Sequence, residues 1–126
     1  MKKIKVRIPL KSKIFNSENM WVEKLSNGVG KIRNIPYFAT QYKYGDIVKF
    51  DPETMIVQKV ISDGGYTRTR FCKFTGDRQL ENEYWFDKGY IIEFISSNMI
   101  VVCRPRDKKE WVKRKKINWR TSLPTV

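Results

Sequence analysis

The sequence predicts an α+β protein: a small N-terminal antiparallel β-barrel of the SH3-like kind, followed by a β-α-β-β-α lobe. Two observations carry this prediction. The first half holds five short strand-like segments with tight turns between them. The second half places a helix-like segment among strand-like ones, after the breaker Asp63-Gly64-Gly65. We therefore expect the barrel over residues 1–62, the lobe over 63–120 and a tail over 121–126.

The first expected strand covers residues 2–8, where apolar and charged side chains alternate strictly. This period of two is typical of a half-buried strand, here with a cationic outer face. Pro9 ends the strand or marks a sheet edge. The cations of the outer face are Lys3, Lys5 and Arg7.

Turn signals delimit the other strands of the barrel. Asn27-Gly28 suits a hairpin turn, and Asp51-Pro52-Glu53 suits a further turn. Pro36 holds the chain extended just before the aromatic pair Tyr37 and Phe38. The expected strands cover residues 20–25, 29–32, 47–50 and 55–61.

In the lobe, the helix has the clearest signals. Asp77 is its expected N-cap and Gly89 its C-terminal stop, and Leu80 and Tyr84 are spaced to form an apolar face. The expected elements are a strand over residues 67–74, the helix over 78–88, two strands over 90–95 and 99–103, and a last helix over about 107–118.

Four stretches of the sequence carry a resemblance to a known family. They are Glu18-x-Met20-Trp21, Asn34-Ile35-Pro36-Tyr37-Phe38-Ala39, Tyr44-Gly45-Asp46-x-Val48, and the run from Ser62 to Arg70. In this order they resemble a bacterial family known only as domain of unknown function 4265, over about residues 18–71. The resemblance implies a shared fold unit. Because the family has no established activity, it implies no catalytic residue.

The net charge of +13 is concentrated at the two ends of the chain. Residues 1–13 hold six cations and no acid, and residues 104–120 hold nine cations and two acids. The 11 cations between them are balanced by 11 acids. This segregation favours nucleic acid, an anionic membrane surface or an acidic protein as the partner, the alternative being a role in solubility alone.

We expect the two basic ends to bind RNA or DNA backbone with low sequence specificity, since phosphate contacts release counterions whatever the sequence. No zinc finger, RNA-recognition motif or helix-turn-helix pattern is present in the sequence. Exposed aromatic residues beside the cations would favour RNA or single-stranded DNA through stacking. The candidate binding residues are Lys3, Lys5, Arg7, Arg104, Arg106, Lys108, Lys109, Lys113, Arg114, Lys115, Lys116 and Arg120.

The residue inventory predicts no enzyme, no metal and no cofactor. The chain has no histidine, which removes the commonest general base and metal ligand near neutral pH. Cys72 and Cys103 make a poor zinc site, and we expect them reduced and buried, with a disulfide between them left open. The alternative is a histidine-free nuclease that uses Tyr66, Arg68, Arg70 and Glu93.

A second alternative is an inhibitor or adaptor that docks on an acidic protein, for example by blocking a nucleic-acid-processing or defence enzyme. No apolar run approaches the length of a membrane span, and the N-terminus Met1-Lys2-Lys3 lacks the apolar stretch of a signal peptide, so we expect a cytoplasmic protein. The basic segments carry few aliphatic residues, so we do not expect membrane binding.

Overall fold

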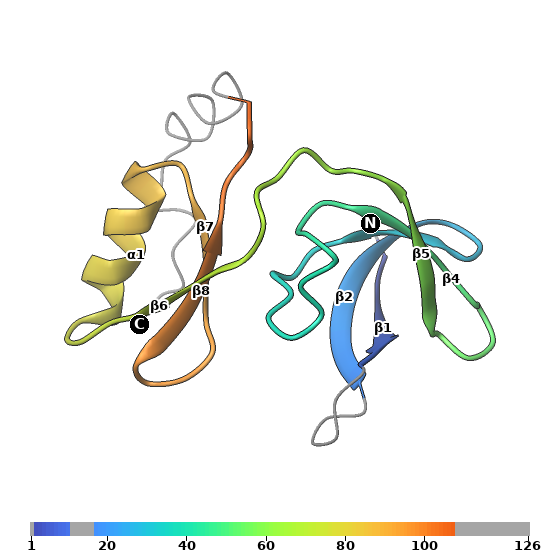
Figure 1. Cartoon of the computed structure of the whole chain (residues 1–126), viewed down its shortest axis with the longest axis horizontal. Coiled ribbons are helices and arrows are strands. Elements are labelled where there is room, and N and C mark those ends of the chain that lie inside the picture. Colours follow the sequence, from blue (N-terminus) through green and yellow to red (C-terminus); the bar gives the residue numbers. More distant parts are fainter. Residues whose placement is uncertain (1, 11–16, 108–126) are drawn as a thin grey trace. The chain divides into compact units, whose positions relative to one another are not determined.

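The computed structural model describes residues 2–10 and 17–107, in two compact units (Figure 1). Unit 1 is Met1–Thr69 and unit 2 is Arg70–Val126. The described residues form mostly antiparallel β-sheet with one helix, which confirms the predicted α+β class. Each unit is built around its own group of buried side chains.

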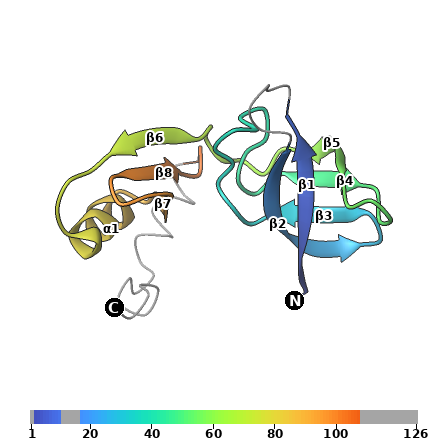
Figure 2. The ribbon, with the colours of Figure 1, turned by 90° about the horizontal axis from the view of Figure 1, so that it is seen from below.

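Unit 1 is a meander in which each strand pairs antiparallel with the next (Figure 2). Tight turns make this order possible, and the predicted turn at Asn27-Gly28 joins the second and third strands, with Gly28 at φ 77°. The strands are β1 (Lys3–Pro9), β2 (Ser17–Ser26), β3 (Val29–Ile32), β4 (Ile47–Phe50) and β5 (Val57–Ser62).

The core of unit 1 is formed by alternate side chains of these strands. Val6 and Ile8 point inward from β1, and Met20 and Val22 do so from β2. The strict alternation that predicted a half-buried first strand is therefore confirmed. The buried residues that complete this core are Ile32, Ala39, Tyr42, Val48, Phe50 and Val57.

Unit 2 pairs a three-stranded antiparallel sheet with one helix. Its elements are β6 (Arg70–Lys73), α1 (Arg78–Asp87), β7 (Ile91–Phe94) and β8 (Met99–Cys103), and the sheet order is β6-β8-β7. Its core consists of Phe74, Trp85, Ile100 and Val102. The last predicted helix lies outside the described residues, except for its first residue.

The ends of α1 follow the predicted capping. The Asp77 carboxylate accepts hydrogen bonds from the backbone N–H groups of Gln79 at 2.7 Å and Leu80 at 3.4 Å. Gly89 follows the helix at φ 82°, a conformation that glycine adopts without steric cost.

The predicted apolar face of the helix, in contrast, is wrong. Leu80 is 64% exposed and Tyr84 is 54% exposed, whereas Trp85 is buried. One residue turns the helix by roughly 100°, so a face centred on Trp85 moves both predicted residues toward solvent. The larger indole fills the space above the sheet, and its N–H donates to the Glu81 carboxylate at 2.9 Å. Glu81 and Trp85 show the same spacing of four residues.

The two cysteines do not form a disulfide. Cys72 on β6 lies opposite Ile100 of β8, whereas Cys103 lies opposite Ile91 of β7. The pairing register therefore separates the two thiols along the sheet.

Tyr42 gives unit 1 a predictable loss of stability at alkaline pH. Its side chain belongs to the core, and burial raises the pKa of Tyr42 above its ordinary value of 10.0 by disfavouring the phenolate. The contribution of the buried, protonated Tyr42 side chain to the free energy of unfolding is complete below the ordinary pKa of tyrosine. It is lost as pH rises toward the raised value, because the unfolded chain releases the proton first.

We therefore expect the free energy of unfolding of the wild type to fall more steeply from about pH 9 to about pH 11 than that of Tyr42→Phe. Urea denaturation of both proteins over this range measures the difference. Equal pH slopes would contradict a buried, titrating Tyr42.

Candidate nucleic-acid interface

Antiparallel pairing in unit 1 gathers cations on the outward side of three strands. Lys5 lies opposite Trp21 and Lys3 opposite Glu23, and Glu23 in turn lies opposite Lys31 on β3. Residues directly opposite one another on one face of a sheet are in contact distance. We call this surface the β1–β3 outer face. It consists of Lys3, Lys5 and Arg7 on β1, Asn19, Trp21 and Glu23 on β2, Lys31 on β3, and Arg33 just after β3.

This face carries five cations and one acid. The β1 cations are exposed, and Lys31 and Arg33 are partly exposed. Alternate residues of an extended strand are about 7 Å apart, so the three β1 cations form an evenly spaced row. The inward packing of Val6 and Ile8 fixes this row, since every second side chain must face outward.

The single acid of the face is neutralised locally. Both the Nε and Nη2 atoms of Arg33 donate to Glu23 Oε2, at 3.1 and 2.7 Å. Burial alone lowers the pKa of Arg33, but hydrogen bonds with Glu23 and Tyr44 outweigh it and raise the pKa above the ordinary value. Arg33 therefore stays charged and matches Glu23. The positive excess comes from Lys3, Lys5, Arg7 and Lys31.

Trp21 is an exposed aromatic ring within this positive face. Its side chain is 45% exposed, and the Lys5 ammonium lies 5.3 Å from the ring centroid. Both backbone polar groups of Trp21 are hydrogen-bonded. Its N–H donates to Asn34 Oδ1 at 2.5 Å, and its carbonyl accepts from the Arg33 N–H at 2.9 Å.

Glu18 performs a different task, on the inward side of β2. Glu18 is buried, with 5% exposure. Its carboxylate accepts hydrogen bonds from three successive backbone N–H groups, those of Tyr37 at 3.0 Å, Phe38 at 2.9 Å and Ala39 at 2.7 Å. Successive backbone N–H groups that converge in this way form an anion-binding nest. The carboxylate thus anchors the loop between β3 and β4 onto β2.

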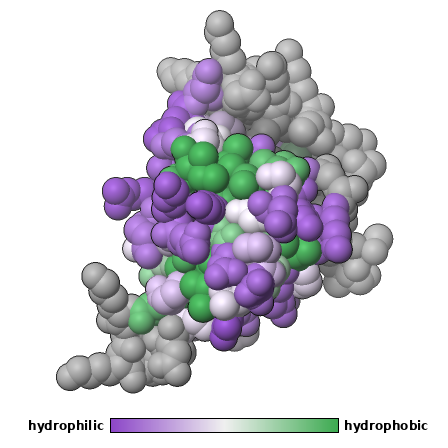
Figure 3. Space-filling view, turned by 90° about the vertical axis from the view of Figure 1, so that its right-hand side faces the viewer, coloured by the Kyte–Doolittle hydropathy of each residue, from purple (hydrophilic) through white to green (hydrophobic). Residues whose placement is uncertain are grey.

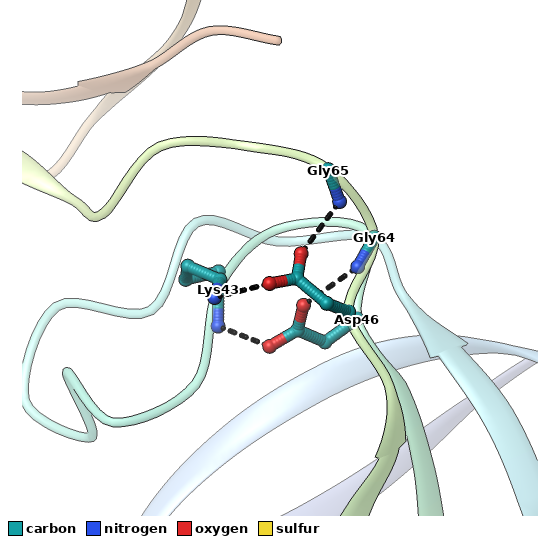
Figure 4. Close-up of polar contacts among 5 residues, drawn as sticks. Lys43, Asp46, Gly64 and Gly65 are labelled. Carbon is teal, nitrogen blue, oxygen red and sulfur yellow. Dashed lines mark hydrogen bonds and ion pairs between the residues drawn. The ribbon is translucent and has the colours of Figure 1, made fainter. Parts of the chain in front are cut away.

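Asp46 anchors a second loop from the start of β4 (Figure 4). Its Oδ1 accepts from the Gly64 N–H at 2.9 Å and its Oδ2 from the Lys43 N–H at 3.0 Å. A Cβ on Gly64 would lie 2.2 Å from the backbone C and O atoms of Gly45, so this close approach requires glycine. The neighbouring Asp63 pairs with the Lys43 ammonium at 3.0 Å and accepts from the Gly65 N–H at 2.7 Å.

These two buried carboxylates are occupied by backbone groups and lie away from solvent, at 5% exposure for Glu18 and 1% for Asp46. Each of them holds a loop in place through hydrogen bonds, and the two do not form an exposed pair of acids for general acid–base chemistry. Within residues 2–10 and 17–107, no group of three His, Cys, Asp or Glu residues is placed to hold a metal ion.

Two of the four residues of the alternative nuclease site, Tyr66 and Arg70, contact aromatic rings. Tyr66 packs edge-on against Tyr44, with ring centroids 4.9 Å apart, within unit 1. Arg70 in unit 2 lies with its guanidinium 5.9 Å from the Trp85 ring centroid. Both contacts are of the kind that stabilise a fold.

The structure places five of the predicted binding residues. Lys3, Lys5 and Arg7 lie together on the outward side of β1. Arg104 in unit 2 lies 5.7 Å from the Tyr90 ring centroid, and Arg106 is exposed. The other predicted residues lie outside the described part of the chain: Lys108, Lys109, Lys113, Arg114, Lys115, Lys116 and Arg120.

Sequence reasoning missed Trp21, Lys31 and Arg33 as parts of this face. The alternation of β2 contains the signal for Trp21, because inward-facing Met20 and Val22 leave the residue between them outside. For Lys31 and Arg33 the sequence offers no comparable signal, since their position depends on the register between β2 and β3.

Exposed hydrophobic side chains also lie in patches among hydrophilic ones on the surface (Figure 3). In unit 1 the large ones are Trp21, Leu25, Phe38, Val60 and Ile61. The helix in the described ranges is too short and too polar to cross a membrane.

Comparison with known proteins identifies a family and a fold. The sequence matches the family described as Domain of unknown function (DUF4265) over residues 18–83, more than half of the chain, which confirms the resemblance seen in the motifs. A crystal structure of a hypothetical protein from Neisseria gonorrhoeae is similar, with a TM-score of 0.62 and 19% identity over 97% of this chain and 88% of that chain. At this identity the likeness concerns the fold alone. No curated protein matches the sequence.

The three hydrogen bonds to Glu18 generate a prediction about stability. Glu18→Gln replaces one accepting oxygen by an NH2 group that faces a backbone donor, and we expect it to lower the free energy of unfolding of unit 1 by about 2 kcal/mol. Glu18→Ala leaves all three donors without the carboxylate and is expected to cost about 3 kcal/mol or more.

Urea denaturation measures this loss, and hydrogen exchange of the amides of Tyr37, Phe38 and Ala39 localises it. The matched control is Glu53→Gln in the exposed turn before β5, which is expected to change neither quantity. Wild-type exchange of the three amides in Glu18→Gln would contradict the anchoring role.

Proposed function

The chain belongs to the DUF4265 family, and we propose that it is a small, basic, non-enzymatic protein that binds RNA or DNA with low sequence specificity. The β1–β3 outer face is the proposed binding surface in unit 1. The observation that carries the proposal is the row of exposed cations on β1, beside an acid that Arg33 already neutralises.

The electrostatic argument rests on the spacing and exposure of these cations. Lys3, Lys5 and Arg7 follow one another at about 7 Å along β1, whose alternate residues are packed in the core. A nucleic-acid backbone offers charges at a comparable separation, and each neutralised phosphate releases counterions to solvent. Lys31 extends the row across the sheet, on the far side of Glu23.

Low sequence specificity follows from the kind of cation on the face. Lysine is a compact point charge on a flexible stem, which suits phosphate and carries little information about bases. The face belongs to a sheet, and no helix of unit 1 is described that would enter a major groove.

The basic C-terminal segment supplies a second set of cations in this proposal. Residues 104–120 hold nine cations and two acids, a charge density found in segments that bind nucleic acid. Both basic ends of the chain would therefore contact phosphates. We also propose that the protein acts in the cytoplasm, where such a ligand is abundant.

The finer architecture belongs to the same proposal: unit 1 is a small SH3-like barrel. The Arg7 N–H donates to the Met55 carbonyl at 2.8 Å, and Arg7 forms a parallel bridge with Ile56 just before β5. Met55 adopts φ 62°, a left-handed conformation that turns its carbonyl toward β1. These contacts between β1 and the segment just before β5 support closure.

The test is fluorescence anisotropy of labelled single-stranded RNA, single-stranded DNA and duplex DNA against salt concentration. We expect log affinity to fall linearly with log salt. Reversing Lys3, Lys5 and Arg7 to Glu removes three phosphate contacts, so the magnitude of the slope should drop by about 2 to 3.

The matched control reverses two lysines and one arginine outside the face, namely Lys73, Lys88 and Arg78, all exposed in unit 2. This variant has the same net charge and is expected to keep more of the slope. Equal losses in both variants would contradict the location. Absence of binding at low salt would refute the proposal and favour docking on an acidic protein, to be tested by pull-down from lysate.

A further inference from the structure

We propose that Trp21 is a stacking platform for an unpaired base, which makes single-stranded RNA or DNA the preferred ligand of the β1–β3 outer face. This inference rests on the proposed function and adds a ligand class and a residue to it. Trp21 is the one large aromatic side chain among the outward-facing residues of β1 to β3.

The position of the ring within the face is the first argument. Trp21 lies directly opposite Lys5, and Lys3 and Arg7 are the neighbours of Lys5 in the same outward row. Trp21 is 45% exposed, whereas inward-facing Met20 and Val22 on either side of it are buried. A large apolar ring at such a position adds nothing to the core, and it offers a π-face to a ligand whose phosphates the lysines attract.

The rigidity of the platform is the second argument. The N–H of Trp21 is bound by Asn34 and its carbonyl by the Arg33 N–H, so the residue is fixed beyond the regular pairing of β2 with β3. The Glu18 carboxylate ties the loop that follows Asn34 to the same strand. With its backbone fixed in this way, Trp21 has only two side-chain torsions to order when a base stacks on its ring, so the entropy cost of stacking is small.

Lys5 links the two parts of the ligand. Its ammonium lies 5.3 Å from the ring centroid, the geometry of a solvent-exposed cation–π contact. A stacked base gains more than such a contact, because it buries two apolar faces. When a base covers the ring, the ammonium loses its contact with the indole. The flexible lysine stem then lets it pair with the adjacent phosphate of the ligand.

Duplexes do not match this arrangement. In a duplex each base is already stacked within its strand and paired across the helix, so its π-face is hidden from a side chain on a sheet surface. A duplex still presents phosphates to Lys3, Lys5 and Arg7. The ring therefore discriminates between single strands and duplexes, whereas the cations serve both.

A protein partner would use an exposed tryptophan differently. Interface hot spots sit in apolar surroundings that exclude water, whereas the nearest outward neighbours of Trp21 across and along the strands are Lys5, Asn19 and Glu23. Leu25, 49% exposed at the end of β2 beyond a register shift, is the nearest comparable apolar side chain on that strand. The surroundings of Trp21 thus favour a ligand that is both aromatic and anionic.

The test compares Trp21→Ala, Trp21→Phe and the control Leu25→Ala, using labelled oligo-uridine RNA and a duplex DNA of equal length in the same anisotropy assay. Trp21→Ala is expected to weaken RNA binding by about 5- to 150-fold, the range of one lost stacked base, and to leave duplex affinity and both salt slopes unchanged. Trp21→Phe keeps a ring and is expected to retain most of the RNA affinity. Leu25→Ala is expected to match the wild type.

The outcomes separate the two proposals. If the wild type binds RNA and duplex with steep salt slopes but Trp21→Ala weakens both equally, or neither, stacking is overturned and the proposed function stands. Urea denaturation of the three variants is the control for folding. Transitions that match the wild type show that a change in affinity reflects binding. If the wild type binds neither nucleic acid at low salt, the proposed function fails and the stacking role fails with it.

Discussion

Unit 1 depends on the burial of one carboxylate. Glu18 points inward from β2 and accepts the three backbone N–H groups that follow Pro36, a residue with no N–H of its own. A buried charge is stable only when hydrogen bonds replace its water, and here the loop supplies them. These hydrogen bonds fix the loop beside β2. Asn34 Oδ1 is thereby placed to accept the N–H of Trp21.

The buried acids and the exposed cations of unit 1 therefore have separate tasks. Glu18 and Asp46 stay inside, where each holds a loop through backbone N–H groups. The cations of β1 stay outside, because the inward alternation of Val6 and Ile8 gives them no other place. An acid on the outward side, Glu23, is matched by Arg33. The positive face is thus a consequence of the same packing that forms the core.

Local signals explain why the strands, turns and helix ends could be predicted from the sequence. The period of two in β1, the turn at Asn27-Gly28 and the cap at Asp77 each involve neighbours in the chain. The helix face went wrong because Trp85 competes with Leu80 for the same sheet, and that competition is decided by volume in the core. Likewise, partners such as Glu18 and Ala39 are 21 residues apart, a distance at which register and tertiary packing decide and sequence patterns are silent.

Nuclear magnetic resonance mapping of backbone amides during titration would show whether the ligand lies on the outward side of β1 and β2, as proposed. Isotope-labelled protein would be titrated with unlabelled oligo-uridine RNA, and the shifts followed residue by residue. We expect the largest shifts at Lys3 to Arg7, at Asn19 to Glu23 and at the Trp21 indole N–H. Shifts confined to the strands and helix of unit 2, or no shifts at all, would contradict it.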